Sequence, residues 1–181
     1  MTAPSNTETN PEAPQPKITD AIRFDYLAAF PEGYAKLSAW GHVINTSGLE
    51  QSLLELISMR SSTLNGCAMC LDKHSKQAIK AGETTERLFA IAAWRDSPFF
   101  TPRERAALQW TDAITNIQTG HAPLAAWHEM LVHFTEAEAV QVTHAITNMN
   151  TQHQNMQAPA ESISIINSPL IIIGQGPFPV C

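Results

Sequence analysis

Start and stop signals for helices follow one another along most of this chain, and no alternation of apolar and polar residues typical of a strand competes before residue 160. Two segments have the sequence of a capping box, in which a threonine and a glutamate three residues later bond each other's backbone N–H groups. They begin at Thr101 and Thr135, and Pro102 stands at the first helical position, where proline is favoured. The sequence therefore predicts an all-α fold.

Apolar residues at helical spacing, together with the glycines between them, give approximate bounds for the predicted helices. Leu53, Leu56 and Ile57 form one apolar stripe, and Asn65-Gly66 supplies a stop before another helix begins at Cys67. We expect helices over residues 31–45, 49–61, 67–81, 83–94, 102–120, 123–133 and 135–150.

Composition divides the chain into one domain and two flanking segments. The 181 residues, 44% of them hydrophobic, suffice for a single domain with its own core. Residues 1–17 hold four prolines and no large apolar side chain after Met1, which predicts a disordered tail. The pattern changes again after Pro159, where isoleucines alternate with proline and glycine. We therefore expect a domain over residues 18–158 and an irregular extension over 159–181.

Charge and cysteine content exclude several classes of protein. A net charge of −6 argues against binding to nucleic acid or to anionic lipid, because either surface would need clustered lysine and arginine. No run of about 18 uncharged apolar residues indicates a membrane span, and residues 1–17 do not resemble a signal peptide. Three cysteines are too few for a disulfide-stapled secreted scaffold. We expect a cytoplasmic protein with no nucleic-acid or membrane partner.

The chemistry is concentrated in a C-x-x-C motif at the start of one predicted helix. Residues three or four apart on a helix have Cβ atoms roughly 5–6 Å apart, so Cys67 and Cys70 can form a disulfide and His74 follows one turn later. Thiols in such first turns have pKa values of roughly 3.5–7.5. A thiolate that attacks a peroxide becomes a sulfenic acid, which a second thiol converts to a disulfide. On a helical projection Cys67, Cys70, Leu71, His74, Ala78 and Ala81 share one face, and Asp72, Lys73, Lys76 and Lys80 share the other.

Two other readings of the cysteines stay open at this point. A C-x-x-C can be half of a zinc site, although zinc needs four ligands and no second C-x-x-C or spaced Cys/His pair lies nearby in the sequence. Two buried structural cysteines beside a core histidine would give the same pattern.

Trp94 and Trp110 are expected in the core, and Cys181 is expected to take no part in the chemistry. No metal ligand is predicted among the remaining histidines, which are His42, His121, His128, His133, His144 and His153.

The segment from Arg60 to His74, RSSTLNGCAMCLDKH, resembles the alkyl hydroperoxidase D-like (AhpD-like) branch of the carboxymuconolactone decarboxylase family. The resemblance continues through residues 81–83, 93–95 and 100–108 and covers roughly residues 20–150. It implies an AhpD-like helical bundle with the C-x-x-C at the start of a central helix. It also implies assembly into homo-oligomers, as trimers or hexamers, with that helix near a subunit interface.

The same resemblance implies roles for four residues. The family pattern is a glutamate twelve residues before the first cysteine and a histidine four residues after the second, and Glu55, Cys67, Cys70 and His74 occupy these positions. By analogy Cys70 is the peroxidatic thiol and Cys67 the resolving thiol, while Glu55 and His74 draw the proton from Cys70. The implied partners are a peroxide substrate and a lipoylated or thioredoxin-like dithiol reductant. No cofactor or metal is required.

Two residues depart from what the family or the periodicity would suggest. Some relatives place a second histidine between the cysteines, where this chain has Met69, so a proton relay must run through His74 or a water molecule. Periodicity alone predicts that Glu55 is a solvated surface residue, because it projects away from the apolar stripe of its helix. Two rival functions remain: a non-enzymatic, redox-responsive oligomeric scaffold, and decarboxylase chemistry on a lactone, whose namesake enzyme lacks the C-x-x-C.

Overall fold

The computed structural model describes residues 26–156, in which the regular elements are all helices and no strand occurs. The expected tail over 1–17, the extension over 159–181 and the outer ends of the expected domain lie outside these residues. No helix in the described part is both long enough and apolar enough to cross a membrane. The elements are α2 (Tyr26–Ala29), α3 (Pro31–Asn45), α4 (Gln51–Asn65), α5 (Ala68–Lys80), α6 (Thr85–Ala90), the 3-10 helix η1 (Ile91–Ala93), α7 (Pro102–Thr115), α8 (Ile117–Gly120), α9 (Leu124–His133) and α10 (Glu136–Met156).

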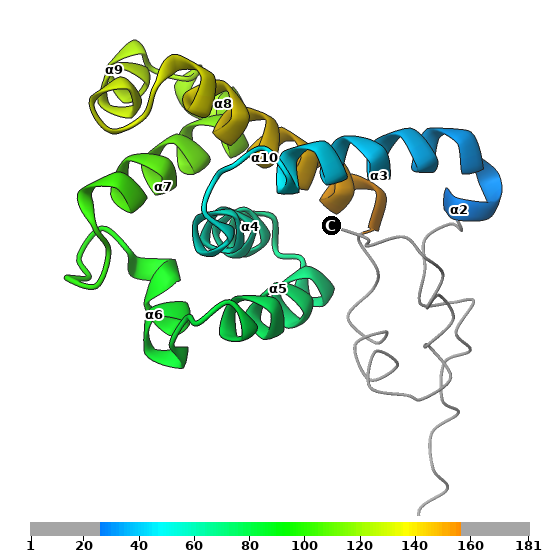
Figure 1. The fold of residues 1–181 in the computed structure, drawn as a ribbon, viewed down its shortest axis with the longest axis horizontal. Helices are drawn as coiled ribbons and strands as arrows, with labels where there is room; N and C mark the ends of the chain where they lie inside the picture. Colours follow the sequence, from blue (N-terminus) through cyan, green and yellow to red (C-terminus); the bar gives the residue numbers. More distant parts are fainter. Residues whose placement is uncertain (1–25, 157–181) are drawn as a thin grey trace, which may run out of the picture.

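Helix α4 is the centre of the fold and has neighbours on several sides. Figure 1 views it almost end-on, and α5, α7 and α10 all pack against it. Ten consecutive residues of α4, from Leu53 to Ser62, are buried. A helix with only one covered face would bury about half of them, so α4 is enclosed by the rest of the chain.

The predicted helices are confirmed, with differences at their ends. Helix α3 has the bounds expected for it, 31–45. Helices α4 and α10 each end several residues later than expected, at Asn65 and Met156. The segment expected over 83–94 is α6 followed by η1, and the segment expected over 102–120 divides into α7 and α8. The division falls at Asn116, whose side-chain amide donates to the carbonyl of Asp112 at 3.2 Å. Such local bonds compete with a continuing helix.

Both capping boxes form as the sequence predicts. The backbone N–H of Thr101 donates to Glu104 at 2.7 Å, and the N–H of Glu104 donates back to the threonine hydroxyl at 3.3 Å. At the start of α10 the N–H of Thr135 donates to Glu138 at 2.8 Å, and the reciprocal bond is 3.3 Å long. These bonds satisfy N–H groups that have no partner inside the helix.

Two apolar clusters lie on opposite flanks of α4. One joins Leu53, Leu54 and Ile57 to buried residues of α7, α9 and α10, and the other joins Leu56 and Met59 to residues of α5, α6 and α7. Trp110 belongs to the first cluster and Trp94 to the second, and both are buried as the sequence predicts.

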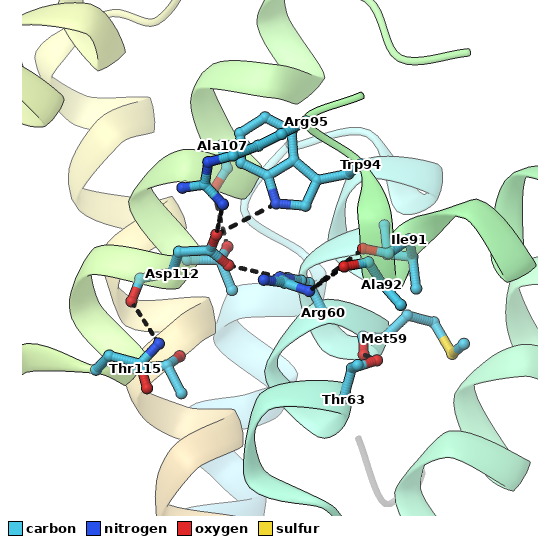
Figure 2. A network of polar contacts seen from close by, with 12 residues as sticks. Met59, Arg60, Thr63, Ile91, Ala92, Trp94, Arg95, Ala107, Asp112 and Thr115 are labelled. Atoms are coloured by element: carbon cyan, nitrogen blue, oxygen red, sulfur yellow. Dashed lines mark hydrogen bonds and ion pairs between the residues drawn. The ribbon is translucent and has the colours of Figure 1, made fainter. Parts of the chain in front are cut away.

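A buried ion pair ties α4 to α7. The Nε of Arg60 donates to Asp112 at 2.5 Å, and its guanidinium also donates to the backbone carbonyl of Ala92 at 3.1 Å. Trp94 and Arg95 donate to the other oxygen of the same carboxylate, as Figure 2 shows. Each charge therefore has several partners, as burial requires.

Candidate redox-active site

The turn between α4 and α5 places the first cysteine. Gly66 adopts a left-handed conformation with φ of +66°, which a residue with a side chain adopts at a cost. The N–H of Gly66 bonds to the carbonyl of Thr63, and the N–H of Cys67 bonds to the carbonyl of Ser62 at 3.0 Å. This is the Schellman pattern that commonly ends helices. Cys67 therefore follows α4 immediately and becomes the N-cap of α5.

Cys67 and Cys70 are joined by a disulfide, and both side chains are buried. Their Cα atoms are 5.3 Å apart, within the range that disulfides require. The pair stands at the start of α5, where free backbone N–H groups and the helix dipole favour a thiolate after reduction. The spacing of the motif thus produces a cystine at a helix N-terminus.

Glu55 and His74 form a buried pair beside the cysteines. The Nδ1 of His74 lies 2.9 Å from the Oε2 of Glu55, and the two residues are 3% and 5% exposed. Gln51 donates to the other carboxylate oxygen at 2.9 Å. The solvated position that periodicity predicts for Glu55 is wrong, because other helices cover that side of α4 as well. The residue that the family resemblance selected is therefore in contact with His74.

The amphipathic face predicted for α5 is largely confirmed. Cys70, His74 and Ala78 are buried, whereas Lys76 and Lys80 are exposed. Ala81 is also exposed, so its predicted inward position is wrong. Helix α5 ends at Lys80, and residues beyond the end no longer follow the projection of the helix.

A second imidazole lies close to the disulfide. It belongs to His153 on α10, more than eighty residues further along the chain. One of its ring nitrogens and the two cysteine sulfurs all lie within 4.8 Å of one another. The amide of Asn65 lies 2.8 Å from Nδ1, and the hydroxyl of Ser62 lies 3.0 Å from Nε2. Asn65 donates to Nδ1, so the ring proton sits on Nε2 and is donated to Ser62.

Burial, and after it the nearby charge of His74, lower the pKa of His153 from 6.5 to about 4. The imidazole is therefore neutral at neutral pH. Ser62 in turn donates to the carbonyl of Ser58 at 2.7 Å, which completes an ordered chain of hydrogen bonds. This chain fixes the ring beside the sulfur atoms.

A small cavity adjoins the Glu55–His74 pair. Its internal volume is about 20 Å³, room for about one water molecule. Ser58 and Asn148 contribute polar groups to its wall together with Glu55 and His74. The pair therefore lies beside a space with a polar wall that one water molecule can occupy.

Comparison with known proteins places this site in a family. Residues 27–113 match the model of the carboxymuconolactone decarboxylase family. The uncharacterized protein YdfG of Bacillus subtilis is 34% identical over 116 residues, which are 64% of this chain and 79% of YdfG. The chain belongs to the carboxymuconolactone decarboxylase family. Within it, the chain is AhpD-like.

Two solved structures have a similar fold. The protein ATU0492 of Agrobacterium tumefaciens, of unknown function and described as a candidate AhpD antioxidant defence protein, is 33% identical with a TM-score of 0.71. The match covers 81% of this chain and 97% of ATU0492. The debrominase Bmp8 shares the fold at 19% identity, with a TM-score of 0.61 over 75% of each chain.

Relatives named alkyl hydroperoxide reductase AhpD match a shorter part of this chain. Alkyl hydroperoxide reductase AhpD of Streptomyces coelicolor is 44% identical over 55 residues, which are 29% of this chain and 31% of that protein. The match therefore supports the family and the local motif, and the activity of the whole protein is a separate question.

Sequence reasoning missed one residue of this AhpD-like site. His153 has no ligand-like spacing to any other histidine, and its partners Ser62 and Asn65 lie 91 and 88 residues away. The one hint of its position in the sequence was that Ser62 and Asn65 stand five and two residues before Cys67. Met69, which stands where some relatives have a histidine, is half-buried, and the second imidazole comes from α10 instead.

Proposed function

We propose that this protein is a thiol-dependent peroxidase that reduces hydrogen peroxide or organic hydroperoxides. The observation that carries the proposal is the buried Cys67–Cys70 pair at the start of α5, together with His74 one turn further along α5 and its hydrogen bond to the buried Glu55 of α4. This arrangement supplies a nucleophile, a resolving thiol and an acid–base group. The rival scaffold function uses the disulfide alone and gives no role to the buried carboxylate.

In the first step the thiolate of Cys70 attacks the distal oxygen of the peroxide. The O–O bond breaks, the sulfur is oxidised to a sulfenic acid, and the other oxygen leaves as an alcohol, or as water from hydrogen peroxide. His74, held by Glu55 through Nδ1, accepts the thiol proton and returns one to the leaving oxygen. The cavity beside the pair has room for one water molecule, a further group that can carry a proton.

In the second step the thiolate of Cys67 attacks the sulfur of the sulfenic acid. A disulfide forms and the hydroxyl leaves as water, so two electrons from the two thiols reduce one peroxide. An external dithiol, of the lipoylated or thioredoxin-like kind, then restores both thiols by disulfide exchange. The Cα separation of 5.3 Å allows this bond to form without moving the helix backbone.

Rapid mixing of the reduced protein with peroxide tests the proposal. Under anaerobic conditions, hydrogen peroxide and an alkyl hydroperoxide should each consume two thiols per chain at a rate that rises with peroxide concentration. Thiol counting after the reaction gives the stoichiometry. Slow oxidation that does not depend on the kind of peroxide would favour the scaffold function instead.

The two cysteines should behave differently when each is replaced. Cys70→Ser should abolish peroxide reduction, whereas Cys67→Ser should react once and stop as a sulfenic acid, because attack and resolution use different sulfur atoms. Mass spectrometry after trapping with a sulfenic-acid reagent distinguishes the products. A trapped sulfenic acid in Cys70→Ser, with no reaction in Cys67→Ser, would reverse the two roles.

A further inference from the structure

Three potential metal ligands meet at the disulfide. The sulfur atoms of Cys67 and Cys70 and one ring nitrogen of His153 lie within 4.8 Å of one another, and all three residues are buried. They come from the turn before α5, from α5 itself and from α10. Two segments that are far apart in the sequence therefore converge on one point.

The distances are close to those of a metal site. With Zn–S bonds of about 2.3 Å and Zn–N bonds of about 2.0 Å, tetrahedral ligand atoms lie roughly 3.5–3.8 Å apart. The nitrogen needs to approach the sulfurs by roughly 1.3 Å at most to reach this geometry. The sulfurs need to separate, as they do when the disulfide is reduced.

The chemistry of the ligand set favours a divalent thiophilic cation. Two thiolates enclosed together carry two negative charges, which a buried site holds only if they are neutralised. One Zn²⁺ neutralises both, and thiolate and imidazole are ligands it prefers. The three protein ligands leave a fourth position for water.

The surroundings of His153 match those of a metal-binding histidine. A histidine that binds a metal through one nitrogen usually keeps a hydrogen bond at the other, and this second contact orients the ring. His153 has such a partner at each nitrogen, Asn65 at Nδ1 and Ser62 at Nε2. A metal bound at Nδ1 takes the place of the Asn65 contact and leaves the Nε2–H of His153 donating to Ser62.

We propose that the reduced protein binds one Zn²⁺ through Cys67, Cys70 and His153, and that disulfide formation releases it. Binding displaces the two thiol protons. On oxidation a peroxide takes two electrons from the two thiolates, forms an alcohol and water with two protons, and leaves the disulfide and free Zn²⁺. The release by peroxide rests on the proposed function, whereas the binding does not. The metal would then protect the thiols until an oxidant arrives.

Cobalt titration of the reduced protein tests the binding without any peroxide. In a Cys181→Ser background, anaerobic protein should bind one Co²⁺ and show sulfur-to-cobalt charge-transfer absorption together with the ligand-field bands of a tetrahedral site. The oxidised protein should show neither. Zn²⁺ added afterwards should displace the cobalt and remove the bands.

Variants of His153 separate this site from a simple dithiol. His153→Gln should weaken cobalt binding by more than about 100-fold, and His153→Cys, which offers a thiolate at the same place, should restore most of it. His128→Gln, at an exposed position on α9, should leave the affinity unchanged. Far-UV circular dichroism checks that each variant remains folded.

Two results would overturn the site. One is the absence of charge-transfer bands in the reduced wild type, and the other is wild-type affinity in folded His153→Gln. A protein that binds cobalt with these bands but does not reduce peroxides would keep the metal site and remove the peroxidase function. A protein that reduces peroxides but binds no cobalt would keep the peroxidase function and remove the metal site.

Discussion

At the scale of single residues, the polar side chains of α4 make the site. Glu55, Arg60 and Ser62 are all buried, and each has a partner on another helix: His74, Asp112 and His153. An unpaired charge at Glu55 or Arg60 would cost several kcal/mol, and an unpaired buried hydroxyl at Ser62 would cost less, so each pair also fixes the position of a neighbouring helix. Two of the three pairs lie next to the cysteines.

Removing either member of the Glu55–His74 pair should slow the first reaction with peroxide. Glu55→Gln and His74→Ala should each reduce that rate by about 10²–10⁴-fold, because general acid–base groups contribute this much. Stopped-flow measurement over a range of pH gives the rate, and Glu86→Gln, at an exposed position on α6, is the matched control. If Glu55→Gln kept wild-type kinetics at every pH, the proton relay would be wrong.

At the scale of elements, the contact between α4 and α7 depends on one carboxylate. Asp112→Ala should destabilise the protein by about 3 kcal/mol, because it leaves the guanidinium of Arg60 buried without its counter-charge. Asp72→Ala removes a partly exposed ion pair with Lys76 and should cost less than about 0.5 kcal/mol. Urea unfolding of the oxidised variants measures both. Equal losses would show that burial of the Arg60 pair contributes nothing.

The capping box of α10 should make stability depend on acid. The backbone N–H of Thr135, and then Arg103 and the threonine hydroxyl, lower the pKa of Glu138 from 4.5 to about 2. The folded state therefore favours the ionised carboxyl, and this stabilisation is complete above the unfolded value of 4.5 and is lost as pH falls through about 2. Because the side chain is partly exposed, we expect a loss on the order of 1 kcal/mol.

Glu138→Gln should remove this part of the acid dependence. The unfolding free energy should differ less between pH values above 4.5 and near 2 than it does in the wild type, since glutamine does not titrate. Glu136→Gln, an exposed residue in the same first turn, should leave the difference as it is. An unchanged acid dependence in Glu138→Gln would mean that the capping box is not a titrating contact.

At the scale of the whole molecule, apolar side chains remain exposed on α9, which lies at the edge of the fold in Figure 1. Leu124 is 66% exposed and Val132 is 70% exposed. Such residues gathered on one element often mark an interface between subunits. The predicted homo-oligomer, a trimer or hexamer, therefore has a surface on which it could form.

The double variant Leu124→Glu/Val132→Glu should convert the oligomer into monomers, because charges replace apolar contacts. Light scattering coupled to size-exclusion chromatography measures the mass. Phe89→Glu, which alters an 81% exposed residue on α6, is the control. If the double variant still assembles, the subunit interface lies on another face. If the wild type is fully active as a monomer, the active site does not need a second subunit.

What the sequence determined by itself is local. Helix starts and stops, both capping boxes and the place of the cysteines at a helix N-terminus depend on residues within a few positions of one another. Backbone hydrogen bonding and side-chain spacing act over this range, so these features could be read directly. The family resemblance added Glu55, which periodicity placed on the surface.

Only the tertiary structure decided what covers each helix. Helix α4 has one apolar stripe in its sequence, but it is enclosed, so Glu55 and Ser62 are inside. His153 reaches the cysteines because α10 packs against α4, a contact between residues about ninety positions apart that no local pattern encodes. Burial depends on neighbours brought together by the whole chain, and so the second histidine of the site could be found only there.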